Sequence, residues 1–254
     1  MLTREQLLEQ YKKVLIEQGK EFNLCLITNS NINDIKGGIL LVGINPCGEP
    51  IGKGVDPYEY ECCQTKFWRP KHEMMGKDDP INNYDKKCAY IDLIPIRTKN
   101  QNQLLGYLRS ENALMGALLS YTQDYIESLS PRLIIYANSL CGLWGLNKTK
   151  IKGSSDDKVE YKNAWMGYDF EPIIQSPLEG IEDKGHWPYF KITGIIPSGV
   201  NRMRTTSNLI GSFFLRYGQH YTIKGQIPKK QQLTPVDIKR IVESIDPEWA
   251  KTLL

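Results

Sequence analysis

The chain has 254 residues and a formal net charge of +3, and 41% of its residues are hydrophobic and 24% are charged. This balance excludes an intrinsically disordered, collagen-like or coiled-coil protein. The longest apolar runs, residues 39–42 and 133–135, are much shorter than the roughly 20 residues that cross a bilayer, and the first residues carry no signal-peptide core. We therefore expect a single globular domain over residues 1–254, located in the cytoplasm.

The six cysteines are expected to be reduced thiols, because none of them are spaced as Cys-x-x-Cys and the chain shows no secretory signal. A metal or iron–sulfur site could be built from Cys62, Cys63, Cys88 and either His72 or Cys47, but adjacent cysteines cannot easily chelate one small tetrahedral centre and the spacing matches no standard ligand pattern. We expect neither a metal nor an organic cofactor. The three histidines are predicted to be surface or structural residues.

The predicted elements begin with a helix. Thr3 and Gln6 form a capping box at the head of an amphipathic run that continues to about residue 21. Residues 39–44 are continuously apolar, which is typical of a strand buried on both faces of a parallel sheet. A turn over residues 45–48 follows this strand.

Three more strands are predicted at residues 89–96, 133–137 and 190–196. Helical spacing fills residues 103–129, a short helix is predicted at 206–217, and a last one begins at Thr234 with a proline in its first turn. Residues 147–188 lack this pattern and are predicted to be an insertion of loops with a hairpin. The alternation predicts a three-layer α/β/α domain with a short, mostly parallel central sheet.

Polar clusters follow each predicted strand, at residues 45–48, 97–100, 138–139 and 197–202. In open α/β sheets, ligands bind outside the carboxyl ends of the strands. These four clusters are therefore the candidates for a functional site.

Three motifs carry a resemblance to a known family: Gly43-Ile44-Asn45-Pro46, then Lys66-Phe67-Trp68, then Pro197-Ser198-Gly199-Val200-Asn201-Arg202. In this order and at predicted strand ends, they resemble the uracil-DNA glycosylase superfamily and are most similar to its mismatch-specific uracil/thymine branch. The likeness covers residues 37–217 apart from the insertion. It implies a monomeric, cofactor-independent hydrolase of DNA repair that flips a uracil-like or mismatched base and cleaves its N-glycosidic bond.

The resemblance assigns the catalytic role to Asn45, whose amide can position a water. The flipped base would be bound by residues close to Asn45 and by an aromatic ring that stacks on it. The candidates for base binding are Ile44, Tyr60, Phe67 and Asn138, and Tyr60 is the one nearest in sequence to the family's stacking residue. The alternatives are structural, with Asn45 capping the turn and Phe67 and Trp68 anchoring a helix in the core.

The DNA backbone would be held by the last motif and an arginine beyond it, namely Pro197, Ser198, Gly199, Val200, Asn201, Arg202 and Arg204. This loop opens the stretch 200–240, which has eight Lys and Arg side chains against one acid, Asp237. A basic stretch is typical of a phosphate-binding surface, although many such runs are only solvated faces.

The chain departs from the family pattern at two positions. Cys47 replaces a glycine, and Ile196 stands where the family has His or Asn, which removes a polar group that could stabilise the departing base. Two further interpretations therefore remain open. One is a nucleic-acid-binding or nucleotide-binding relative without catalysis, and the other is a pocket for a non-DNA ligand that the insertion closes.

Overall fold

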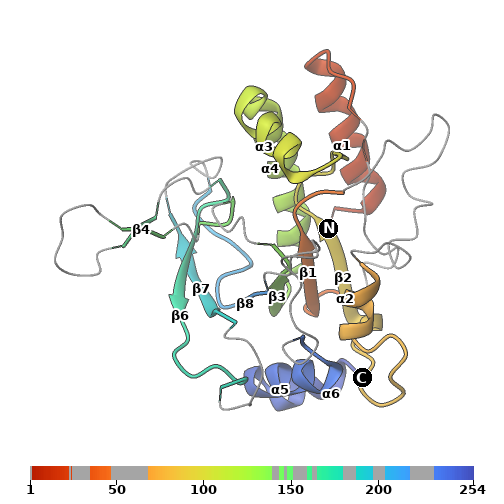
Figure 1. Ribbon diagram of the computed structural model, residues 1–254, viewed down its shortest axis with the longest axis vertical. Helices are drawn as coiled ribbons and strands as arrows, with labels where there is room; N and C mark the ends of the chain where they lie inside the picture. The colour runs from red at the N-terminus through yellow and green to blue at the C-terminus, as the bar shows by residue number, and fades with distance from the viewer. Residues whose placement is uncertain are drawn as a thin grey trace.

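The computed structural model of the chain describes residues 2–22, 24, 35–46, 68–138, 143–145, 165–179, 187–196, 204–217 and 232–254, and the backbone alone of residues 148–150 and 159–161. A six-stranded mixed sheet, parallel across four neighbouring strands and antiparallel across the rest, forms the centre of the fold (Figure 1). The strand order across the sheet is β2-β1-β3-β8-β7-β6.

The parallel half of the sheet consists of β1 (Ile39–Gly43), β2 (Cys88–Asp92), β3 (Leu133–Tyr136) and β8 (Phe213–Arg216). β1 pairs with both β2 and β3, and β3 pairs with β8, all in parallel register. Every residue of β1, β2 and β3 is buried. This confirms the expectation that continuous apolar runs build a parallel sheet covered on both faces.

The other half of the sheet is antiparallel and differs from the sequence prediction. β7 (Tyr189–Ile195) runs antiparallel to β8, and β6 (Tyr168–Pro172) runs antiparallel to β7. The helix predicted at 206–217 is wrong, because residues 213–216 form strand β8. A run as short as this one cannot be assigned to helix or strand by periodicity alone.

The predicted insertion contributes both a hairpin and a strand of the main sheet. β4 (Lys148–Lys150) and β5 (Val159–Tyr161) pair antiparallel to each other in a separate two-stranded sheet, as the sequence suggested. β6, from the same insertion, forms the edge of the six-stranded sheet. This segment is therefore partly integral to the core and not only a decoration.

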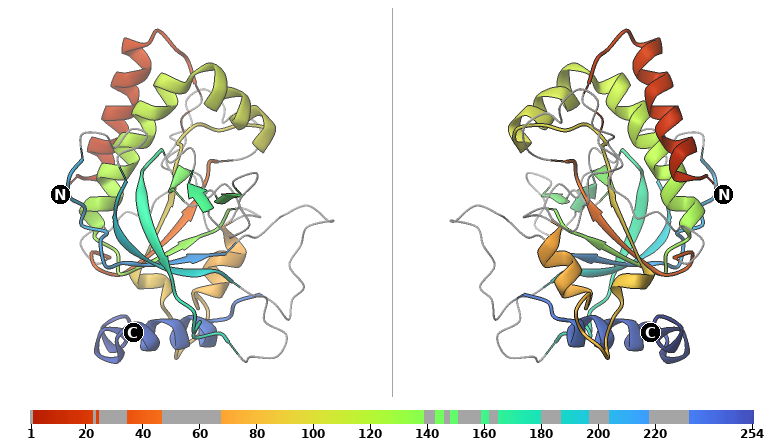
Figure 2. Two further views of the ribbon diagram at one scale, coloured as in Figure 1. Left: turned by 90° about the vertical axis from the view of Figure 1, so that its left-hand side faces the viewer. Right: turned by 90° about the vertical axis from the view of Figure 1, so that its right-hand side faces the viewer.

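Helices cover both faces of the sheet (Figures 1 and 2). One face carries α1 (Arg4–Glu17), α3 (Gln101–Ser110) and α4 (Asn112–Leu129). The opposite face carries α2 (Arg69–Met74), α5 (Pro235–Ile245) and α6 (Pro247–Thr252). The single helix predicted at 103–129 is therefore two helices, separated at Glu111, whose backbone leaves the helical region with φ −122° and ψ 39°.

The two faces of the sheet bury separate apolar clusters. Leu40 and Val42 of β1 point into the cluster under α1 and α4, and Ile39 and Leu41 point into the cluster under α2, α5 and α6. This alternation follows from the two-residue period of a strand. No helix in the described part of the chain is long and apolar enough to cross a membrane.

The two ends of the described chain carry the caps that the sequence predicted. Thr3 and Gln6 exchange their capping-box hydrogen bonds at the head of α1, and Thr234 and Asp237 do the same at the head of α5. Beyond α5, Trp249 of α6 donates from Nε1 to the carbonyl of Gly37 at 3.0 Å. This bond ties the last helix to the chain just before β1.

Candidate functional site

Polar side chains gather where β1, β2 and β3 end, at one edge of the sheet. Gly43 pairs with Asp92 at the ends of β1 and β2, and Asn138 follows β3. Hydrogen bonds continue past the strands, from the Ile94 amide to the Ile44 carbonyl at 2.9 Å and from the Thr98 amide to the Pro46 carbonyl at 3.1 Å. The segment that carries Asn45 is therefore held firmly beside the segment that follows β2.

Asn45 is half-buried, and its amide nitrogen is committed to the protein. Nδ2 lies 2.8 Å from Thr98 Oγ1, 3.1 Å from the Ile96 carbonyl oxygen and 2.9 Å from the Pro46 carbonyl oxygen. Within the described residues, the Oδ1 acceptor of Asn45 has no protein partner. The side chain thus serves the turn through its nitrogen and can still orient a donor, such as a water, through its oxygen.

Ile44 and Asn138, both predicted to bind the base, lie at this same edge. The Ile44 side chain is only 6% exposed and belongs to the core cluster under α1 and α4, and its carbonyl already accepts from Ile94. Asn138 is half-buried two residues after the end of β3. Asn138 is thus the polar side chain at this position, while Ile44 contributes to packing.

Asp92 is a site candidate that the sequence analysis did not single out. It is 2% exposed, and neither of its carboxylate oxygens has a hydrogen-bond partner in the described structure. Burial raises the pKa of Asp92 to about 8, against a smaller lowering by the nearby Lys71. An acid with a raised pKa and unpartnered oxygens, at the carboxyl end of a parallel strand, is a recognised sign of a functional position.

Lys71 lies on α2 and is completely buried. Burial lowers the pKa of its ammonium group well below the usual value, and Asp92 acts in the opposite direction. Since burial disfavours the charged form of both groups, the pair favours a neutral carboxylic acid beside a neutral amine. The pair therefore holds one proton and no net charge inside the protein.

A second polar cluster lies next to this pair. His72 Nδ1 is 2.6 Å from Asp85 Oδ1, the Tyr90 hydroxyl donates to the same oxygen, and the His72 and Tyr90 rings face each other at 4.1 Å. His72 is thus a structural residue, which agrees with the sequence prediction. Trp68 is 1% exposed and meets Tyr90 edge to face, so it anchors the core as the structural alternative proposed.

Several predicted site residues lie outside the described residues. They are Cys47, Tyr60 and Phe67, and the whole loop Pro197, Ser198, Gly199, Val200, Asn201 and Arg202. Their roles in base and DNA binding stay predictions.

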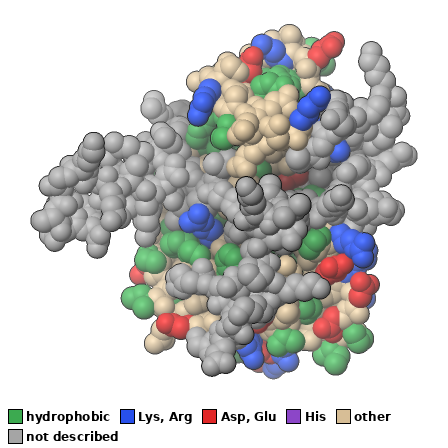
Figure 3. Space-filling model, viewed as in Figure 1, with side chains coloured by type: hydrophobic (Ala, Val, Ile, Leu, Met, Phe, Trp, Pro, Cys, Tyr) green, Lys and Arg blue, Asp and Glu red, His purple; other side chains and the backbone are tan. Residues whose placement is uncertain are grey.

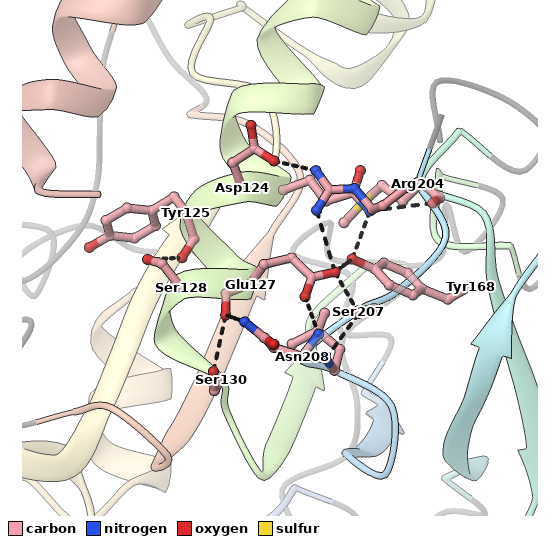
Figure 4. A network of polar contacts seen from close by, with 12 residues as sticks. Asp124, Tyr125, Glu127, Ser128, Ser130, Tyr168, Arg204, Ser207 and Asn208 are labelled. Atoms are coloured by element: carbon pink, nitrogen blue, oxygen red, sulfur yellow. Dashed lines mark hydrogen bonds and ion pairs between the residues drawn. The ribbon is translucent and has the colours of Figure 1, made fainter. Parts of the chain in front are cut away.

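The structure does not bring Arg204 to the edge where Asn45 lies. Because β7 runs antiparallel to β8, Ile196 ends its strand at the opposite edge, with its amide bonded to the Gly167 carbonyl at 2.6 Å. Arg204 lies beside the last turns of α4, where it forms ion pairs with Asp124 and Glu127 (Figure 4).

Glu127 organises the network around Arg204. It is 5% exposed and accepts from the Tyr168 hydroxyl at 2.7 Å, the Ser207 hydroxyl at 2.5 Å and the Asn208 amide at 2.7 Å (Figure 4). Buried groups that are fully partnered stabilise and fix a fold. The network therefore fastens the segment before β8 to α4.

Of the eight basic side chains in the stretch 200–240, Arg202, Lys224, Lys229 and Lys230 lie outside the described residues. On the face of the molecule that Figure 3 shows, the described Lys and Arg side chains stand in small groups among acidic ones. Lys239, for example, lies 3.8 Å from Glu243 on α5. In the described part of the chain, no group of three His, Cys, Asp or Glu side chains could hold a metal ion.

Comparisons with known proteins give no relative for this chain: no family model, no curated protein and no solved structure matches it. The candidate site therefore rests on its own residues. One sequence signal could have pointed to Asp92, because it is the single acid inside the otherwise apolar run at residues 88–96.

Proposed function

We propose that the protein is a DNA glycosylase-like hydrolase that cleaves the N-glycosidic bond of a flipped uracil-like or mismatched base, on a three-layer fold of the uracil-DNA glycosylase type. The observation that carries the proposal is the state of Asn45. Its nitrogen is fixed by Thr98 and Ile96 while its oxygen is left to orient a water, at the carboxyl end of the central strand β1. The motif Gly43-Ile44-Asn45-Pro46 supports the same reading.

The chemistry follows from this placement. A water hydrogen-bonded to Asn45 Oδ1 attacks C1′ of the sugar, and the bond between C1′ and the base nitrogen breaks with its electron pair going to the base. Asn45 is a weak base, so its part is to orient the water and not to take its proton. Neither a metal nor a cofactor is needed in this scheme.

A non-catalytic nucleic-acid-binding or nucleotide-binding relative is the alternative. One observation favours it: Ile196, at the position where the family has His or Asn, is apolar and ends its strand at the sheet edge opposite Asn45. It therefore supplies no polar group that could stabilise a departing base. In that case the protein binds DNA or a nucleotide without turnover.

The test is a cleavage assay on oligonucleotides with U·G, U·A and T·G pairs and on single-stranded uracil. We expect cleavage of at least one substrate, and we expect Asn45→Ala to lower the single-turnover rate constant about 100-fold or more, because the water loses its orienting group. Asn102→Ala, an exposed asparagine in α3, is the matched control and should cleave at the wild-type rate.

Asn45→Ala also removes the bonds to Thr98 and Ile96, so its unfolding free energy should fall by about 1 kcal/mol, and folding must be checked by circular dichroism. A wild-type protein that leaves every substrate uncut, where a known glycosylase cuts them, refutes the proposal. Salt-dependent DNA binding in the same preparation would then support the alternative.

A further inference from the structure

Hydrolysis at a nucleobase needs a group that stabilises the charge arriving on the departing base. Ile196 cannot supply it, since its side chain is apolar and it stands at the sheet edge opposite Asn45. The polar group must therefore come from another element near Asn45.

Asp92 is placed to meet that need. It pairs with Gly43, two residues before Asn45, and strand spacings of about 4.8 Å across and 3.3 Å along the chain put the Cα atoms of Asp92 and Asn45 within roughly 10 Å. A flipped base bound next to Asn45 spans a gap of that size. Asp92 and Asn45 can thus act on opposite ends of one scissile bond.

The neighbours of Asp92 across the sheet are small residues. Cys88 and Tyr90 precede it at two-residue intervals and point into the cluster under α2, so Asp92 belongs to the same face. The next positions across this face are Gly43, its partner in β1, and Ala137, which follows β3. One has no side chain and the other only a methyl group, while the Asp92 oxygens lack partners in the described structure.

We propose that Asp92 is a catalytic residue that contacts the departing nucleobase and gives it a proton, with Lys71 as the positioning residue that shares this proton. The inference rests on the proposed function. As the C1′–N bond breaks, its electron pair passes to the base, and the Asp92 O–H bond breaks to protonate that base. The attacking water forms the C1′–O bond, and the proton it releases restores the acid form of Asp92 through solvent.

The protonation state agrees with this role. Burial raises the pKa of Asp92 to about 8, so the acid form predominates at neutral pH. Among the described residues, the buried or half-buried titratable groups on this face of the sheet include Lys71 and His72 on α2, Tyr84 and Asp85 before β2, Cys88 and Tyr90 on β2, Tyr189 on β7, Tyr217 after β8 and Asp237 on α5. Of these, Lys71 is the group that acts on the Asp92 pKa, and it lowers it.

The experiment compares single-turnover rates between pH 5 and pH 10. In the wild type, the rate constant should fall above about pH 8 as Asp92 ionises. Asp92→Asn keeps the shape and a hydrogen-bond donor but cannot give a proton, so its rate should drop about 100-fold and lose the fall above pH 8. Lys71→Met should move that fall to higher pH, because an ionised Asp92 favours the ammonium form of Lys71, and this positive charge lowers the pKa of Asp92.

Two controls separate chemistry from structure. Asp78→Asn and Lys77→Gln change exposed residues close to α2 and should leave the rate and its pH profile unchanged. Binding of an oligonucleotide whose uracil carries a non-cleavable 2′-fluoro sugar should change no more than a few-fold in Asp92→Asn.

The outcomes distinguish the two proposals. A wild type that cleaves, together with an Asp92→Asn variant that cleaves at the same rate with the same pH profile, overturns the role of Asp92 alone. A wild type that cleaves nothing overturns the proposed function and this inference with it.

Discussion

Replacing Asp92 by Asn should stabilise the protein at neutral pH. The folded protein keeps this buried carboxyl group protonated up to about pH 8, whereas the unfolded chain ionises it near the usual value of 3.8. Between these values, folding must take up a proton, so wild-type stability falls as the pH rises. Asparagine has the same shape and no proton to take up, so the unfolding free energy of the variant does not fall with pH in this way.

The magnitude follows from the two pKa values. Each pH unit between 3.8 and 8 costs the wild type about 1.4 kcal/mol, so the variant should gain about 4 kcal/mol at pH 7. At pH 4 the carboxyl group is protonated in the folded protein and only about half ionised in the unfolded chain, so the difference should shrink to below about 1 kcal/mol. Because the comparison is made between two proteins at each pH, groups common to both largely cancel.

Urea unfolding followed by tryptophan fluorescence, at intervals from pH 4 to pH 9, measures this difference. Asp78→Asn, an exposed aspartate, is the matched control and should show no such trend. If Asp92 and Lys71 were instead a true ion pair, Asp92→Asn would leave a buried ammonium alone and lose about 3–5 kcal/mol. A destabilised variant at pH 7, or a difference that does not grow with pH, would refute the reasoning.

Two other predictions concern the stability of the fold. Glu127→Ala leaves two hydroxyl groups and a backbone N–H without their acceptor. This variant should lower the unfolding free energy, measured by urea unfolding, by about 3 kcal/mol. The control Glu171→Ala, on the exposed side of β6, should change the unfolding free energy by less than about 0.5 kcal/mol. Thr234→Ala removes the cap of α5 and should cost about 1 kcal/mol in the same assay; an unchanged midpoint would contradict the role of the cap shared with Asp237.

The parallel half of the fold could be predicted from sequence because its signals are local. Residues 39–43, 88–92 and 133–136 are apolar runs bounded by turns, and caps such as Thr3 and Thr234 mark their helices directly. The class of the fold and the position of Asn45 at a strand end follow from these features alone.

The antiparallel half depends on pairing, which no local pattern encodes. β8 is as short as a helical turn, and only its place between β3 and β7 makes it a strand. Missing β8 led to the expectation that the strand at 190–196 runs parallel to β1. That error placed the Pro197–Arg202 motif at the same edge as Asn45, although the described end of β7 lies at the other edge.

Only part of the candidate site could be predicted from the sequence, because Asn45 belongs to a local motif and Asp92 does not. A motif drew attention to Asn45, but Asp92 becomes notable only when Lys71, twenty-one residues earlier on α2, is seen to be buried against it. Burial and missing partners are properties of the folded chain. An acid within an apolar strand is the one hint that the sequence offered.

The apolar cluster under α2, α5 and α6 has a consequence for how the chain folds during synthesis. Its members run from Ile39 to Leu253, and Trp249 is bonded to Gly37. The part of this face that α5 and α6 cover therefore stays exposed until residues 235–252 have been synthesised, which takes a few seconds at the usual rate of about 5–20 residues per second. Over that interval, the apolar side chains of β1 and β3 remain open to chaperones and to aggregation.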